Sequence, residues 1–465
     1  MGVSMAGSAN TALDEIIATV LEAQLEDVDA ETVQNAKDRV LDTVGCLIGG
    51  AADPSNPELV KLVKDYGGRP QATILMYGGK VPAGNAAMVN CILCRSFDYE
   101  PVSPVVEDSI VPGHVSGTTV MTALTLSEAV GAGGRELLMA MLLGDDLAAR
   151  LLNTCEFTLA LGWDGNGTAN ALGATAIAGR LLSLNEKQLR NAFGLVLSQL
   201  SGSAQNITES TTAFKLPLGL AARNAVFSAE LALAGWTAPK DALQGRFGYY
   251  DLFTSGIRNE ELLTKDLGKK FWGDRTFKPY PSCRGTHGAI DCALDAVNKH
   301  GIDPDNIEKA TLYLSQSGLK GVLAKPWQIG EFPHGDAMFS FRYTVATALL
   351  RGSVKPEHFT EQAIRDPRTN ELIEKIDFAD LPAGRTGFSI TVYTKDGAKY
   401  SAESKIARGD IPGNPLSRDE LLAKFWDNVE FASRHKRADV ERLLELLEDL
   451  EELRSMDEVT RLLVP

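Results

Sequence analysis

The segment from Lys278 to His287 has side chains suited to binding an anion. It reads Lys-Pro-Tyr-Pro-Ser-Cys-Arg-Gly-Thr-His, so Lys278, Arg284 and His287 place three potential cations within ten residues. Clustered lysine, arginine and histidine side chains favour a carboxylate or a phosphate as the ligand. The alternative is a surface loop with solvated charges, and this segment alone does not decide between the two.

An extended arm that enters a helix is the predicted carrier of these side chains. Two prolines exclude a helix before residue 282, and Gly285 permits a change of direction. Apolar residues then recur at helical spacing from Ala289 to Val297. The free N–H groups at the start of that helix would add to the attraction for an anion.

Three further places bring polar residues to predicted helix ends or to Gly-rich breaks. They are Asp98 and Glu100 followed by His114, the stretch Gly162–Thr168, and Lys215 just before Pro217. Each is weak by itself, because a lone histidine is more often structural and a lysine can extend into water. The Gly-rich stretch matches neither the P-loop nor the dinucleotide-binding pattern.

The composition is that of a globular protein with an acidic surface. The 465 residues include 44% hydrophobic and 23% charged residues, and the formal net charge is −15. Such a charge argues against binding to nucleic acid or to an anionic membrane surface. The six cysteines show no disulfide framework, and Cys91 and Cys94 are expected to be buried thiols rather than zinc ligands.

No segment has the pattern of a targeting or membrane-spanning sequence. Met1–Ala12 lacks the basic and apolar regions of a signal peptide, and no run of about 18 apolar residues is present. We therefore expect a cytoplasmic protein.

Helical patterns dominate residues 11–268, where we expect an α-helical core without strand pairs. Residues 101–112 are expected to form a loop, and residues 169–183 form a helix that is apolar all round and therefore buried. The pattern changes afterwards, because residues 388–394 and 399–404 alternate around Asp-Gly and predict a hairpin in a small antiparallel sheet. A helix is expected over residues 336–351, and the charged tail from Arg418 is helical.

Taken in order, these segments resemble the MmgE/PrpD family, which includes 2-methylcitrate dehydratase, cis-aconitate decarboxylase and iminodisuccinate epimerase. The resemblance runs from about residue 10 to about residue 410. Its motifs are Phe97–Glu100, Pro112–His114, Gly162–Ala174, Leu189–Leu197, Phe214–Asn224, Lys278–His287 and Ala337–Tyr343.

The resemblance implies a mostly α fold with two domains and a site between them. A large all-helical domain would comprise residues 8–268 and 405–465, and a smaller α+β lid domain, residues 269–404, would be inserted before the C-terminal helices. Family members are usually homodimers that act on small di- or tricarboxylates without an organic cofactor, so we expect no cofactor and no metal.

The resemblance also implies roles for individual residues. Lys215, His114, Asp98 and Tyr343 are candidates for proton transfer and for stabilising charge. The candidates for binding the substrate are Lys278, Arg284, His287, Cys283, Thr168 and Asp164. Such reactions share the removal of a proton next to a carboxylate, which needs a base and a positive environment.

Asp164 departs from the family pattern, which commonly has histidine at this position in a Gly-Trp-His-Pro-Thr-like segment. The change removes a proton donor and adds negative charge. We therefore expect a substrate that has fewer carboxylates, or that has an amine or hydroxyl group for Asp164 to bind.

The sequence favours a lyase of the dehydratase type. An epimerase or isomerase acting at the same carbon is the second interpretation, and a decarboxylase is a further alternative on a related acid. A catalytically inactive ligand-binding homologue fits less well, because the lysines, His114, His287 and Tyr343 are all present.

Overall fold

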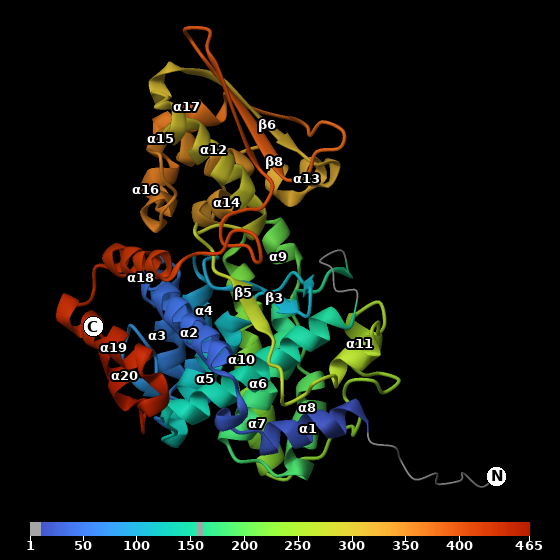
Figure 1. Ribbon diagram of the computed structural model, residues 1–465. Helices are drawn as coiled ribbons and strands as arrows, with labels where there is room; N and C mark the ends of the chain where they lie inside the picture. The colour runs from blue at the N-terminus through green and yellow to red at the C-terminus, as the bar shows by residue number, and fades with distance from the viewer. Residues whose placement is uncertain (1–10, 156–160) are drawn as a thin grey trace.

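The computed structural model describes residues 11–155 and 161–465 and shows a mostly helical chain with small sheets (Figure 1). The predicted start of the first domain, residue 8, lies outside the described residues. So does most of Met1–Ala12, the segment that was examined for a signal peptide. Helices form the lower part of the molecule in Figure 1, and a four-stranded sheet with its covering helices forms the upper part. The mostly α fold class is therefore confirmed, while the exact domain limits stay a prediction.

The lower part is built on helices that pack through small residues. Its principal helices before residue 268 are α1 (Ala12–Glu22), α2 (Ala30–Gly50), α3 (Asn56–Tyr66), α4 (Ala83–Arg95), α5 (Ser116–Val130), α6 (Gly134–Asn153), α7 (Ala169–Leu181), α8 (Glu186–Leu197) and α10 (Leu216–Leu233). As predicted, α7 is buried along nearly its whole length. A Cβ atom on Gly173 would lie 2.5 Å from the carbonyl oxygen of Gly144, so only glycine allows α6 and α7 to approach this closely.

The C-terminal tail returns to this lower part. It forms α18 (Arg418–Ala432), α19 (Arg437–Glu448) and α20 (Asp457–Leu462), and α18 packs against α2. Lys424 Nζ donates to Asp42 Oδ2 and to the carbonyl oxygen of Tyr99, each at 2.8 Å. The tail therefore contacts the chain segment between Asp98 and Glu100 directly.

The upper sheet has the strand order β7-β6-β8-β9. Its strands are β6 (Ile307–Leu314), β7 (Ile376–Asp380), β8 (Phe388–Thr394) and β9 (Lys399–Ser404). The antiparallel pairing of β8 with β9 confirms the predicted hairpin. The sheet is mixed, because β6 and β7 are parallel; that part of the prediction was wrong, since residues 376–380 have no clear alternating pattern.

Helices cover this sheet, and α12 (His287–His300) packs on β8 and β9. The helix predicted over residues 336–351 is two helices, α14 (Pro333–Met338) and α15 (Phe341–Arg351). Ser340 breaks the pattern because its hydroxyl accepts from the Tyr343 amide and caps α15. Shorter helices are α9 (Gln205–Thr208), α11 (Tyr249–Phe253), α13 (Gln316–Lys320), α16 (Glu361–Ile364) and α17 (Pro367–Ile373).

Residues 101–112 are not the loop that the sequence predicts. They contain β3 (Val102–Val106) and β4 (Ser109–Ile110), and β3 pairs on its other edge with β5 (Gly273–Thr276). Pro104 has no N–H to donate to a neighbouring strand, so a proline at this position predicts that the segment is not a central strand. The pairing partner lies about 170 residues away in the chain, so the local sequence gives no sign of it. A further short pair joins β1 (Ala72–Thr73) to β2 (Lys80–Val81).

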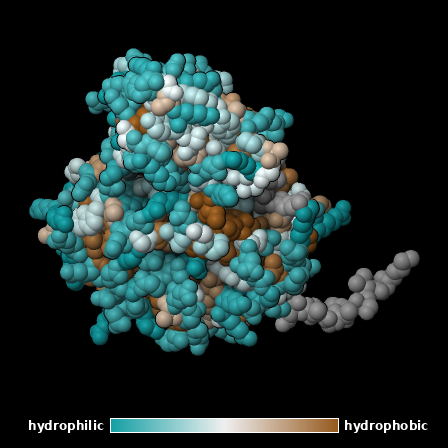
Figure 2. Space-filling model, turned by 45° about the horizontal axis from the view of Figure 1, so that its top comes forward, coloured by the Kyte–Doolittle hydropathy of each residue, from teal (hydrophilic) through white to brown (hydrophobic). Residues whose placement is uncertain are grey.

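The surface in Figure 2 is mostly hydrophilic, with an apolar area near the centre of the view. Ile110 in β4 is one of the exposed large apolar side chains, with an exposed fraction of 51%. Contiguous apolar surface of this kind is typical of interaction sites. Across the described helices, no segment is both long enough and apolar enough to cross a membrane.

Candidate active site

The centre of the candidate site is the turn that follows α4. Arg95, the last residue of α4, directs Nη1 toward Asp98 and toward Glu100 Oε1, the latter at 2.7 Å. All three side chains are almost completely buried. Asp98 has a φ of 48°, a left-handed conformation that is uncommon outside glycine and asparagine-like residues. Such strain is found where surrounding contacts hold a residue in place, as Arg95 does here.

Lys278 reaches this turn from a distant part of the chain through the β3–β5 pairing. Val102 pairs with Thr276, so Glu100 and Lys278 lie two residues beyond the same end of the antiparallel ladder. Lys278 Nζ lies 2.8 Å from Asp98 Oδ1 and also donates to the Asp98 carbonyl oxygen. The strand pair therefore places a second buried cation against Asp98.

His114 completes the cluster and is its most exposed member, with 21% of its side chain accessible. Its Nδ1 lies 2.9 Å from Glu100 Oε1 and 2.9 Å from Arg95 Nη1. Burial, together with Arg95 and Lys278, lowers the pKa of His114, although Glu100 opposes the shift. The imidazole is therefore neutral at pH 7.

The acidic residues and Arg95 both contact Nδ1 or the groups around it. Burial alone would raise the pKa values of Asp98 and Glu100, but Arg95, Lys278 and His114 together outweigh it, and both values fall below their usual range. An ionised Glu100 can only accept and the Arg95 guanidinium can only donate, so each neutral tautomer of His114 has a partner at Nδ1. In the tautomer that donates from Nδ1 to Glu100, the lone pair is on Nε2, for which the described residues provide no hydrogen bond, and Nε2 can accept a proton.

Asp164 lies close enough to interact electrostatically with Arg95 and His114. Its Oδ1 accepts from the Asn166 amide at 3.0 Å, whereas Oδ2 is buried and finds no partner among the described residues. Burial raises the pKa of Asp164. Glu100 Oε2 is likewise buried without a partner in the described structure, so two carboxyl oxygens remain open to a donor.

The segment that first suggested an anion site lies beside this cluster. Burial raises the pKa of Cys283, and its thiol interacts electrostatically with Asp98 and Lys278. His287 is buried at the start of α12, and burial together with Arg284 and Lys278 lowers its pKa well below the usual value. Arg284 does not join the cluster, because its guanidinium binds Asp410.

Three other predicted residues lie apart from His114. Lys215 Nζ is held by Asp53 Oδ2 and the Ser55 hydroxyl, both at 2.8 Å, and burial lowers its pKa. Tyr343 donates its hydroxyl hydrogen to the His358 carbonyl oxygen, and its ring stacks on Trp327.

Thr168 is fully buried at the start of α7 and interacts with Tyr249. Its hydroxyl has no contact with the His114 cluster that the described structure records.

Asp98, Glu100 and His114 have the ligand atoms of a possible metal site, since these atoms lie within 4.8 Å of one another. Arg95 Nη1 already contacts all three residues, and Lys278 neutralises Asp98 from the other side. A divalent cation would have to enter against two buried positive charges. The donor set therefore suits the guanidinium group and does not suit a metal ion.

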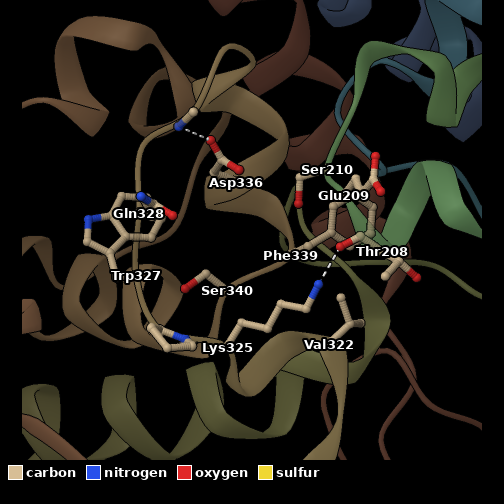
Figure 3. A pocket seen from close by; sticks show the side chains of 12 residues that line it. Thr208, Glu209, Ser210, Val322, Lys325, Trp327, Gln328, Asp336, Phe339 and Ser340 are labelled. Carbon is tan, nitrogen blue, oxygen red and sulfur yellow. Dashed lines mark hydrogen bonds between the residues drawn. The ribbon is translucent and has the colours of Figure 1, made fainter.

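A cavity of about 330 Å³ opens where α9 meets the segment between residues 322 and 340 (Figure 3). Phe339 lines it, and the ring of Phe339 packs 5.6 Å from that of Phe214. The Arg95 guanidinium lies 5.3 Å from the centroid of the Phe214 ring. The contacts of Phe339 and Phe214 therefore connect the wall of this cavity to the buried charges.

Sequence reasoning missed Arg95 and Asp53 as parts of the site, and it named Glu100 beside Asp98 without giving it a role. For Arg95 a local signal exists, because it precedes two acidic residues by three and five positions at a predicted helix end. Asp53 follows an ordinary helix end, and nothing nearby in the sequence points to Lys215, 162 residues later.

Comparisons with known proteins identify the family of this chain. The chain matches the MmgE/PrpD N-terminal domain over residues 14–261 and the MmgE/PrpD C-terminal domain over residues 280–450. It is 26% identical to cis-aconitate decarboxylase of Mus musculus over 457 residues, covering 93% of this chain and 89% of that protein. It is 23% identical to 2-methylcitrate dehydratase of Salmonella typhi over 457 residues, covering 90% and 89%. The chain belongs to the MmgE/PrpD family.

Proposed function

We propose that this protein is a lyase that acts on a small carboxylic acid, and that His114 removes a proton from the carbon next to a carboxylate. The observation that carries the proposal is the neutral His114, with Nδ1 held by Glu100 and Nε2 unbound within the described structure. A positioned base of this kind typically contributes about 10²–10⁴-fold to the rate. The named relatives, a decarboxylase and a dehydratase, support a lyase.

The dehydratase form of the reaction uses two groups of the site. His114 Nε2 takes the proton, the C–H electron pair becomes the carbon–carbon double bond, and the hydroxyl group on the neighbouring carbon leaves. Asp164, whose pKa is raised by burial, can give that hydroxyl a proton so that it leaves as water. Arg95 and Lys278 lie close enough to offset the negative charge that develops. Because these groups suffice for the proton transfers, the proposal includes no cofactor.

Lys215 has no part in this step. Its Nζ is bound by Asp53, Ser55 and Asn56, so it is not free to act as the base in this arrangement. The relatives named above give no support to the isomerase alternative. They do favour a decarboxylase as the second candidate, in which carbon dioxide rather than water leaves.

The charges of the site favour a substrate with few carboxylates. Arg95 and Lys278 are matched by Asp98 and Glu100, so the cluster has no excess positive charge when Asp164 is protonated, as the proposed step requires. A hydroxyl or amino group on the substrate could donate to Asp164 Oδ2 or Glu100 Oε2. We therefore propose a hydroxy or amino acid rather than a tricarboxylate.

Proton NMR in D₂O with a panel of small carboxylic acids tests the reaction. A vinylic product without loss of carbon identifies a dehydratase, and loss of a carboxyl carbon identifies a decarboxylase. His114→Gln should lower the rate about 10²–10⁴-fold, whereas His300→Gln, an exposed histidine at the end of α12, should match the wild type. Full activity in H114Q, or no reaction with any acid, would contradict the proposal.

The role of Asp164 needs a separate comparison. Asp164→His should shift the preference from hydroxy and amino acids toward acids with more carboxylates, because it exchanges a carboxyl for a cationic or neutral imidazole. The measurement is the ratio of the dehydration rates of malate and citrate for the wild type and the variant. An unchanged ratio would show that Asp164 does not select the substrate.

A further inference from the structure

A buried carboxyl group on β5 holds the backbone next to His114. Asp274 Oδ2 accepts from the Val115 amide at 2.9 Å and from the Ser116 amide at 2.7 Å. These are the two residues that follow His114, and α5 begins at Ser116. The first amides of a helix have no partner within the helix, and Val115 provides no side-chain cap of its own. A strand 158 residues away in the chain provides the cap instead.

The position of Asp274 relates His114 to Glu100 and Lys278. Asp274 pairs with Pro104 in the β3–β5 ladder, and beyond the same end of this ladder β3 leads to Glu100 and β5 leads to Lys278. The same residue therefore sets where α5 begins relative to both strands. Its carboxyl is completely buried, so water cannot replace it as the acceptor.

We propose that Asp274 is a positioning residue that fixes the imidazole of His114 against Glu100. It acts through the backbone of Val115 and Ser116 and does not touch His114 itself. The effect of Asp274 on the reaction rate rests on the proposed function. The effect of Asp274 on the position of His114 does not depend on that function. A small displacement of a base can cost up to about 10²-fold in rate, so this contact has consequences for the chemistry.

The groups around the carboxyl explain which substitution is conservative. Asp274 Oδ1 has no partner in the described structure, and Asp145, itself bound to Arg39 Nε at 3.0 Å, lies nearby. Burial raises the pKa of Asp274 to about 8, so near neutral pH the group is largely uncharged. Asparagine keeps an acceptor oxygen of the same shape without charge, and alanine removes the acceptor.

The test is the titration of His114 followed by NMR in the full-length protein labelled at histidine. The chain has six histidines, and the His114 signal is identified by its loss in H114Q. Asp274→Ala should move the midpoint of the His114 titration by about 0.5 or more on the pH scale, and Asp274→Asn should restore most of the wild-type behaviour. His300 serves as an internal reference in every sample.

Asp29→Ala is the matched control. Asp29 caps α2 by accepting from the Thr32 amide at 2.9 Å, so this variant also loses a helix cap, but it does so away from His114. It should leave the His114 titration unchanged. If D274A does not fold, Asp274→Ser, which shortens the side chain but keeps one acceptor, is judged by the same criterion.

An unchanged His114 titration in D274A or D274S, or an equal change in all six histidines, would overturn the proposal. Deuterium exchange into the acid that the wild type turns over gives a second readout, because D274A should lower its rate about tenfold or more at unchanged binding. If the wild type exchanges no acid, the proposed function fails. The response of His114 still decides the positioning role in that case.

Discussion

Arg95 balances the charges of the site, because its guanidinium contacts Asp98, Glu100 and His114 together. Removing one partner of a buried ion pair leaves the other charge uncompensated, which costs about 3–5 kcal/mol. We expect Arg95→Met to lower the free energy of unfolding by an amount in that range. Urea denaturation followed by circular dichroism measures the change.

Arg437→Met is the control for that variant. Arg437 pairs with Glu441 one helical turn away on the exposed surface of α19, where such a pair contributes about 0.3–0.5 kcal/mol. A loss in R95M no larger than in R437M would show that the cluster does not depend on its guanidinium group.

The pH dependence of the reaction follows from His114. Burial and the neighbouring cations lower its pKa below the ordinary value of about 6.5. The base form is therefore present at pH 7 and is lost only as the pH falls below that value. We expect the exchange rate in D₂O to be level from about pH 6.5 to 8 and to decline at lower pH.

A decline that begins above pH 7 would contradict this account of His114. Circular dichroism over the same range serves as a control, because it separates titration of the base from loss of the fold.

At the residue scale, the sequence predicted which side chains belong to the candidate site better than it predicted which groups they contact. Asp98, His114 and Lys278 do meet, and Cys283 and His287 lie beside them. Lys215 and Arg284 were expected among them, yet each is bound to a carboxylate, Asp53 or Asp410. Those partners come from distant segments with no motif of their own, so local sequence could not reveal them.

At the element scale, the first turn of α5 approaches the turn after α4 very closely. A Cβ atom on Gly117 would lie 3.2 Å from Glu100 Cγ, which is tighter than an ordinary contact. Gly117→Ala gains up to about 1 kcal/mol of helix propensity. It should nevertheless lower the exchange rate about tenfold, because Glu100 must move away from His114.

Gly84→Ala is the matched variant for this prediction. Gly84 lies in the first turn of α4, and a Cβ atom there would meet its nearest neighbour at an ordinary 3.5 Å. It should keep the wild-type rate. Equal rates in G117A and G84A would show that Glu100 tolerates the added methyl group.

Helices were predicted well from sequence because their apolar spacing is local. The buried helix predicted over residues 169–183 corresponds to α7, because a run of small and apolar residues is visible in the local sequence. The β3–β5 pair was missed because it joins two short segments far apart in the chain, one with a proline in its centre. That pair brings Lys278 to Asp98, so the missed element is the one that assembles the site.

At the scale of the whole molecule, the homodimer implied by the family resemblance stays a prediction. Light scattering coupled to size-exclusion chromatography should give twice the 50.0 kDa of one chain. The exposed apolar area in Figure 2 is consistent with an interaction surface. A mass equal to one chain at micromolar concentration would contradict the prediction, and a dilution series provides the control for weak association.

The link between Lys278 and Asp98 also bears on how such a chain can be divided. The two family regions end at residue 261 and begin at residue 280, so Lys278 belongs to neither. A fragment ending at residue 261 would contain Asp98 and Glu100 with Arg95 but without their second cation. Gene fusion or circular permutation that moved the joining segment would therefore leave an acidic, unbalanced interior. We therefore expect the charges of this cluster to be balanced only in a chain that contains both halves and the short stretch between them.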